Sequence, residues 1–232
     1  MAITKVTTGT IEDGTIVNAD VNAAAAIVST KLSGVESGLA SVQTFTSSGT
    51  WTRPTGITKV IMEVQGAGGS GSGSPNTEDV TGAGAGGYAK KFLNVSSIST
   101  ATITVGTGGA GVSGTGVNVG NAGGNSSWAD GTNTVTGNGG NGGVITHDTP
   151  TEGGTATNGD INIQGGDGEP RNLADAFTGG SSMFGFGGKG KATGKTTAAR
   201  PPRGYGAGSG GAYNQGSSET GGAGIVIVWE YK

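Results

Sequence analysis

Cysteine is absent from this 232-residue chain. Its absence excludes disulfide frameworks, thiolate metal sites and cysteine nucleophiles. Histidine occurs once, at His147, beside an aspartate and without a second histidine or a cysteine that could share a metal or a proton. We therefore expect His147 to be a solvated loop residue and assign no metal-ligating residue.

Hydrophobic residues make up only 32% of the chain and aromatic residues 5%. A large conventional core is therefore not expected. No apolar run reaches the roughly 18 residues that suggest a membrane span, and the first residues lack the apolar region of a signal peptide. We expect synthesis in a cytosol without a signal peptide, and no membrane insertion.

Charge is also scarce, with 12% charged residues and a net charge of −3. A dedicated nucleic-acid binder would carry a basic excess, so no nucleic-acid partner is expected. Gly106–Gly111 satisfies the G-x-G-x-x-G spacing after a predicted strand, but the next residues cannot open a phosphate-binding helix. Gly165–Glu169 resembles a calcium-binding repeat but occurs once, and no carboxylate pair has glycosidase spacing. We expect a non-enzyme and assign no catalytic or cofactor-binding residue and no cofactor.

Glycine is what the chain has in abundance, and 46 of its 52 glycines lie in the tract from Gly66 to Gly224. Glycine loses much backbone entropy on folding and brings no side chain to pack, so such a tract needs support to become ordered. Two β-branched, apolar runs border it, Ile57–Gln65 and Ile225–Tyr231. They predict strands that pair and hold the two ends of the tract together.

Shorter strand-like islands interrupt the tract at residues 87–95, 101–105, 127–128 and 160–164. Between the islands, glycines recur three apart in short bursts, as at Gly108, Gly111 and Gly114. Three residues per turn is the period of a polyproline-II-type helix, in which glycine lets neighbouring segments approach closely. The glycine-rich loops are therefore either polyglycine-II helices or irregular loops.

The N-terminal part predicts a helix capped by Asp20. Its apolar residues are spaced alternately four and three apart, the spacing of a coiled-coil seam. The seam consists of Val21, Ala25, Val28, Leu32, Val35, Leu39 and Val42. Two interpretations remain open: a short self-association element, or a single amphipathic helix on its own sheet.

Several motifs resemble, in order, the glycine-rich domain at the ends of tailed-phage tail fibres and adhesins. They are Phe45 with Gly49–Val60, Glu63–Gly69, Gly86–Ala89, Ile103–Gly111, Asn125–Trp128 and Gly222–Trp229. The stretches Asp13–Asn22 and Ala26–Leu32 are similar to repeats in phage fibre proteins. The resemblance implies a trimeric, non-enzymatic fibre or adhesin whose distal loops touch the host surface. It transfers no binding residue, because it is poorest between residues 143 and 202.

The expected fold is mainly β and trimeric. A short N-terminal coiled-coil helix in an attachment and trimerisation region, residues 1–42, would precede a β-sandwich with long glycine-rich loops, residues 43–232. The expected partners are two further copies, another virion protein at the N-terminal region, and a host surface glycan or outer-membrane component. The expected location is the virion.

Candidate contact residues come from a cluster of aromatic and basic residues late in the tract. Aromatic rings on glycine loops can stack on sugars, and cations can meet anionic surfaces such as lipopolysaccharide phosphate. The candidates are Phe177, Phe184, Phe186, Lys189, Lys191, Lys195, Arg200, Arg203, Tyr205 and Tyr213. The alternatives are that the rings form a small core for those loops and that the charges are merely solvated.

The sequence thus favours a receptor-binding phage tail fibre protein. A purely structural subunit of a surface filament, without a host ligand, is the competing class. An ice-binding protein is a third possibility, because stacked polyglycine helices present flat surfaces, but no sustained tripeptide repeat supports it.

Overall fold

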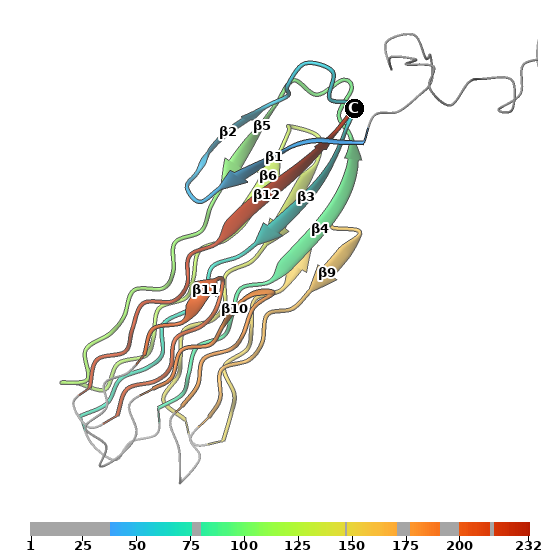
Figure 1. Cartoon of the computed structure of the whole chain (residues 1–232). Helices are drawn as coiled ribbons and strands as arrows, with labels where there is room; N and C mark the ends of the chain where they lie inside the picture. The colour runs from blue at the N-terminus through green and yellow to red at the C-terminus, as the bar shows by residue number, and fades with distance from the viewer. Residues whose placement is uncertain (1–37, 76–79, 147, 171–176, 191–199, 214–215) are drawn as a thin grey trace, which may run out of the picture. The chain divides into compact units, whose positions relative to one another are not determined.

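The computed structural model describes residues 38–75, 80–146, 148–170, 177–190, 200–213 and 216–232. They belong to one compact unit, Gly38–Lys232, while Met1–Ser37 form a separate unit that lies outside the described residues. The described part of the chain is mainly β and contains no helix (Figure 1). Its strands are β1 (Leu39–Phe45), β2 (Gly49–Thr52), β3 (Lys59–Gln65), β4 (Tyr88–Asn94), β5 (Thr100–Thr104), β6 (Ser126–Ala129), β7 (Thr134–Gly137), β8 (Ala156–Thr157), β9 (Ile161–Ile163), β10 (Phe184–Phe186), β11 (Arg203–Tyr205) and β12 (Ile225–Tyr231).

Two five-stranded antiparallel sheets carry the fold. One has the order β1-β12-β3-β4-β9 and the other β2-β5-β6-β7-β8, and β10 pairs with β11 in a separate two-stranded ribbon. The predicted pairing of the two apolar runs is confirmed, because β12 pairs with β3 from Ile225–Gln65 to Tyr231–Lys59. The predicted islands are strands too, β4, β5, β6 and β9. The two borders of the glycine tract are therefore joined.

The two large sheets share one hydrophobic core. Along β3 buried and half-buried residues alternate, as expected for a strand with one face toward the interior. Trp51 and Trp128 meet at its centre, with ring centroids 4.8 Å apart. The buried residues of this core are Trp51, Ile57, Val60, Met62, Val64, Ala89, Val95, Ala101, Ile103, Trp128, Val135, Val226 and Val228.

The predicted coiled-coil helix is wrong at its C-terminal end. Leu39 and Val42, the last two positions of the predicted seam, lie in β1, which pairs with β12. Backbone pairing with the last strand overrides the helical spacing of these side chains. Val21, Ala25, Val28, Leu32 and Val35 lie outside the described residues. A single chain does not test the homotrimer or the role of residues 1–42, which stay predictions.

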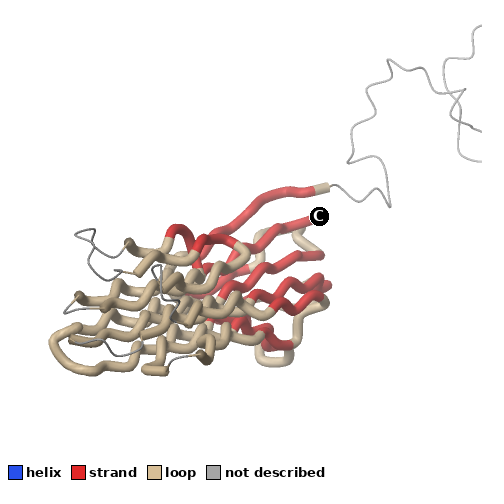
Figure 2. Tube along the Cα trace, turned by 90° about the horizontal axis from the view of Figure 1, so that it is seen from below, coloured by secondary structure: helices blue, strands red, loops and turns tan. Residues whose placement is uncertain are grey.

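The glycine segments leave one end of both sheets and run side by side (Figures 1 and 2). In segment 66–74, N–H groups that are three residues apart donate to the same neighbouring segment. One set donates to segment 81–87 and the next set to segment 118–124, with donor–acceptor distances of 2.8–3.2 Å. The pairs are Gly66–Gly87, Gly69–Gly84 and Ser72–Thr81, then Ala67–Gly124, Ser70–Asn121 and Gly73–Asn118. Three residues per turn is the period of polyproline II. We call the bundle that these hydrogen-bonded glycine segments form, beyond one end of the two sheets, the glycine block.

Close approach explains why glycine is needed in the block. A Cβ atom built at Gly69 would overlap the carbonyl oxygen of Asn141, and one at Gly140 would overlap that of Gly84. The obstacles are backbone atoms of other segments, which no side-chain rotation can move. The block is therefore held together by hydrogen bonds between backbones. These bonds can form only because the glycines at the close contacts have no side chain.

Two buried polar side chains fix the sheets and their junction with the block. Glu230 is fully buried and accepts hydrogen bonds from Trp51 Nε1 and Gln43 Nε2, both at 2.7 Å, and from the Ser41 hydroxyl. Gln65, the last residue of β3, donates from Nε2 to the carbonyl oxygen of Gly86 at 2.7 Å. The Glu230 side chain thus links β12 to β1 and β2 inside the core. The Gln65 side chain links the end of β3 to Gly86 in the block.

Candidate functional site

Phe177 and Tyr213 lie at the end of the glycine block that is remote from the sheets. Both rings are buried and pack with Val80, and Ile145 packs against this cluster. They form a second, small core, as one of the two alternatives for these rings predicted. Their side chains do not lie on the surface that a receptor would meet.

The β10–β11 ribbon holds the more accessible aromatic candidates. Phe184 is half-buried and packs edge-on against Tyr88, with ring centroids 5.7 Å apart. Phe186 is 76% exposed and pairs with Arg203, which is also exposed. Tyr205 is exposed as well and pairs with Phe184. The ribbon therefore brings together four of the predicted residues and presents Phe186 and Arg203 to solvent.

The basic candidates that the structure describes lie on adjacent segments. Lys189 and Arg200 are exposed and form a β-bridge, in which the Arg200 N–H donates to the Lys189 carbonyl oxygen at 2.8 Å. The segment of Lys189 also bridges that of Thr178. Lys191 and Lys195 lie outside the described residues. Two cations, Lys189 and Arg200, are thus held side by side at the end of the ribbon.

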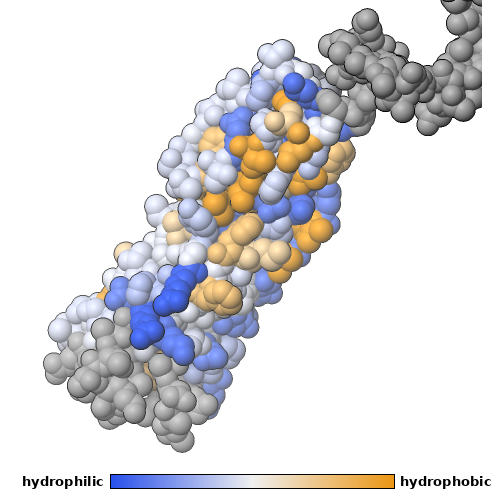
Figure 3. Space-filling view, in the orientation of Figure 1, coloured by the Kyte–Doolittle hydropathy of each residue, from blue (hydrophilic) through white to orange (hydrophobic). Residues whose placement is uncertain are grey.

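Sequence reasoning missed a set of exposed apolar residues. Val117 and Val119 flank Asn118, which bridges Gly73 of the block, and their side chains are exposed. Leu39 and Val42, assigned to a helical seam, instead lie on the outer face of the first sheet, where apolar residues gather (Figure 3). The available signals were the valines on either side of Asn118 and the apolar residues within positions 39–45, but neither pattern indicates exposure.

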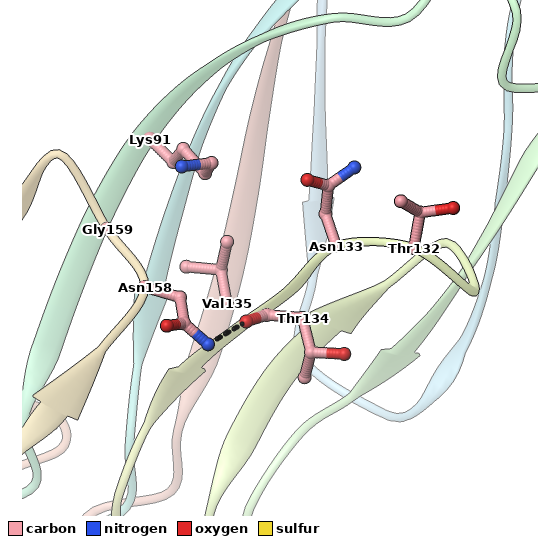
Figure 4. A pocket seen from close by; sticks show the side chains of 7 residues that line it. All are labelled: Lys91, Thr132, Asn133, Thr134, Val135, Asn158 and Gly159. Atoms are coloured by element: carbon pink, nitrogen blue, oxygen red, sulfur yellow. Dashed lines mark hydrogen bonds between the residues drawn. The ribbon is translucent and has the colours of Figure 1, made fainter.

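A polar pocket of about 460 Å³ opens beside β4 and β7 (Figure 4). Its lining residues are Lys91, Thr132, Asn133, Thr134, Val135, Asn158 and Gly159. The Asn158 amide donates to the Thr134 carbonyl oxygen at 2.8 Å, and Lys91 lies 3.5 Å from Asp160. None of these residues was a candidate, because scattered amides and hydroxyls in turns carry no specific sequence signal.

Two carboxylates next to the pocket are held ionised by hydrogen bonds. The Phe92 N–H, at 2.8 Å, and the nearby Lys91 ammonium hold the pKa of Asp160 below its usual range. Burial of Asp130 opposes ionisation, but the Asn133 and Thr132 N–H groups outweigh it and lower the pKa of that carboxyl. Asp130 accepts within its own turn and Asp160 accepts from β4, so both carboxylates are engaged in hydrogen bonds that hold the backbone around the pocket.

In the described part of the chain, no three or more acidic or histidine side chains gather as a metal site would require. The described residues also include no helix with the length and apolarity needed to cross a membrane.

The model of a glycine-rich domain matches residues 41–231, a range that includes the glycine block, every described contact candidate and both sheets apart from the first two residues of β1. The chain belongs to the glycine-rich domain family. Among curated proteins, none matches it. The glycine-rich domain here therefore comprises the two sheets together with the block, since β1 near its start and β12 at its end lie in the same sheet.

Proposed function

We propose that this glycine-rich domain protein is a structural and receptor-binding component of a phage tail fibre, located in the virion. Its partners would be further copies of the chain, another fibre protein at the N-terminal region, and a glycan or outer-membrane component of the host surface. The observation that carries the proposal is the β10–β11 ribbon, where an exposed ring and an exposed guanidinium stand together on a hydrogen-bonded block.

A rigid support favours binding by few side chains. Two contacts hold the ribbon in place. They are the ring contact between Phe184 and Tyr88 and the hydrogen bond that the Ser182 hydroxyl donates to the Tyr205 carbonyl oxygen. Less conformational entropy is then lost when Phe186 meets a ligand. Sequence changes at the block's loops would leave this support intact, because the block is held by backbone hydrogen bonds.

The chemistry of the ribbon suits a negatively charged bacterial glycan. The exposed Phe186 ring offers a flat apolar surface for the face of a sugar. Arg203, paired with it, offers a planar fork for a phosphate or carboxylate. Lys189 and Arg200 add positive charge close by. One such site is weak, and several copies on one particle would raise the overall avidity.

The test is binding of the full chain to a printed array of bacterial lipopolysaccharides and capsular glycans. The double variant Phe186→Ser/Arg203→Ser should lose at least tenfold in apparent affinity for any glycan that the parent protein binds. Thr50→Ser/Thr102→Ser, on exposed positions of the other sheet, is the control and should bind normally.

Unchanged binding by the ribbon variant would overturn its assignment as the contact surface. Failure of the parent protein to bind any glycan or host cell would favour the competing function, a structural fibre subunit without a host ligand. The exposed apolar sheet face described next is the observation that favours that alternative.

A further inference from the structure

The outer face of the β1-β12-β3-β4-β9 sheet carries an apolar row that crosses four strands. The register aligns Val42 with Trp229, Trp229 with Ile61, and Ile61 with Phe92. Phe92 is 52% exposed and Val42 44% exposed, and the two central side chains are half-buried by their neighbours. The solvent-exposed face of an antiparallel sheet normally carries polar residues. A row of large apolar residues on that face therefore indicates contact with a partner surface.

The apolar surface continues beyond the row. Ile161 and Ile163 on β9 are both exposed, and Met183, just before the ribbon, is 60% exposed. In Figure 3 apolar residues form a broad area over β1, β12, β3 and β4 and extend toward the ribbon. Single exposed apolar residues are ordinary, but a contiguous area of this kind marks an interaction surface.

The other large sheet shows that strand formation does not require such residues. Its outward positions are mostly threonine, and the equivalent row runs through Thr50, Thr102, Ala129 and Thr134. Threonine favours strands as valine does while remaining compatible with water. The outward apolar residues of the first sheet are therefore not needed for strand formation. They indicate contact with another surface.

The ion pair near the middle of the apolar face is compatible with an identical face. Lys90 Nζ lies 3.4 Å from Glu63 Oε1, on neighbouring strands near the middle of the face. The pair is neutral as a whole, so it does not repel a second copy.

The size of the face matches what a stable pair of chains requires. Four strands of seven residues and one of three, about 4.8 Å apart, cover a flat area on the order of 500 Å². The relief of the side chains raises the accessible area above this flat figure, toward the roughly 800 Å² per partner of a standard interface. Two identically twisted sheets can pack face to face about 10 Å apart.

We propose that this apolar sheet face packs against the same face of a second copy of the chain. The interface buries the Val42–Phe92 row and leaves the threonine face in water. This assembly does not depend on the proposed glycan binding, because Phe186 and Arg203 are not needed for the contact between rows.

Sedimentation equilibrium of the full-length protein at micromolar concentration tests the proposal. The parent chain should exceed its monomer mass of 22.3 kDa. Val42→Lys/Phe92→Lys, at the two ends of the apolar row, should weaken self-association at least 100-fold. Thr52→Lys/Thr104→Lys, on exposed positions of the threonine face, introduces the same charges on the other sheet and should leave self-association unchanged.

A second measurement does not depend on charged substitutions. Because the chain has no cysteine, a single one can be placed at Thr44→Cys on the outer side of β1, or at Thr104→Cys on the threonine face. Raising the protein concentration should slow maleimide labelling of the first at least fivefold and leave that of the second unchanged. A monomeric parent protein, equal effects of the two lysine pairs, or equal labelling of the two cysteines would each overturn the proposal.

Discussion

The sheets and the glycine block of this molecule are both densely packed, but opposite features of the sequence make them so. The sheets are filled by large side chains, with Trp51, Trp128 and Met62 fully buried between them. The block is filled mainly by backbone, and its N–H groups donate in turn to different neighbouring segments. In the first region side chains supply stability, and in the second their absence does.

The two regions should therefore respond differently to substitution. A core side chain can be truncated at the cost of a cavity, and neighbouring groups relax partly around it. A methyl group added in the block meets a carbonyl oxygen of another segment, whose displacement breaks further hydrogen bonds. Stability in the block is thus more sensitive to added atoms than to removed ones.

Gly69→Ala should produce the largest effect. The added methyl would overlap the Asn141 carbonyl oxygen, while the Gly69 N–H is engaged with Gly84. We expect a loss of more than about 4 kcal/mol in unfolding free energy, measured by urea denaturation. Gly49→Ala is the matched control, because no atom lies within 4 Å of its new methyl, and it should change stability by less than about 0.5 kcal/mol. Equal effects of the two substitutions would remove the distinction between the regions.

Glu230→Leu should have the next largest effect, now in the sheets. It leaves the buried Trp51 indole N–H and the Gln43 amide without their acceptor, which should cost about 3 kcal/mol. Glu230→Gln should cost only about 1 kcal/mol, because its amide oxygen can accept from both donors and the Ser41 hydroxyl can turn to accept. Glu152→Gln, at an exposed position, is the control. Thermal and urea unfolding measure all three, and a more stable leucine variant would contradict the assigned role of Glu230.

Ionisation of Tyr88, which lies at the boundary between the two regions, should give the smallest change in unfolding free energy. Burial, together with the charge of Glu63 and a hydrogen bond to it, raises the pKa of Tyr88 to about 12. Between pH 10 and pH 12 the unfolded chain loses this proton while the folded chain keeps it, so stability falls as the pH rises. We expect a loss of about 1–2 kcal/mol after allowance for solvent screening.

The measurement for Tyr88 compares urea midpoints at pH 9 and pH 11.5 in the parent protein and in Tyr88→Phe. Lysine titration is common to both proteins, so the difference between them isolates Tyr88. The phenylalanine variant should lose less stability over this range. Identical pH dependence would mean that Tyr88 ionises as readily in the folded protein as in the unfolded chain.

The strands were predictable where local sequence and tertiary pairing agree. Residues 57–65 and 225–231 are β-branched and apolar, and they form the β3–β12 pair. The seam was misassigned because Leu39 and Val42 satisfy helical spacing locally, while their conformation is decided by β12, far along the chain. The sequence carries no local sign of that pairing.

The contact residues were predictable as a cluster but not one by one. Phe177 and Tyr213 share aromatic character with Phe186, yet they are buried because Val80 and the segments around them meet at the end of the block. Which glycine segments become neighbours depends on backbone hydrogen bonds between distant residues, and glycine carries no side-chain signal of its neighbours. Glu230 was missed for a similar reason, since its donors come from β1 and β2.

The position of β12 has a consequence for how the chain is made. This strand lies between β1 and β3, yet it is the last to be synthesised. The first sheet therefore cannot close until β12 has been synthesised, and until then the glycine segments lack one of their two bordering strands. Folding of this domain is consequently dominated by contacts between distant residues, a class of reaction that is slow and sensitive to premature aggregation.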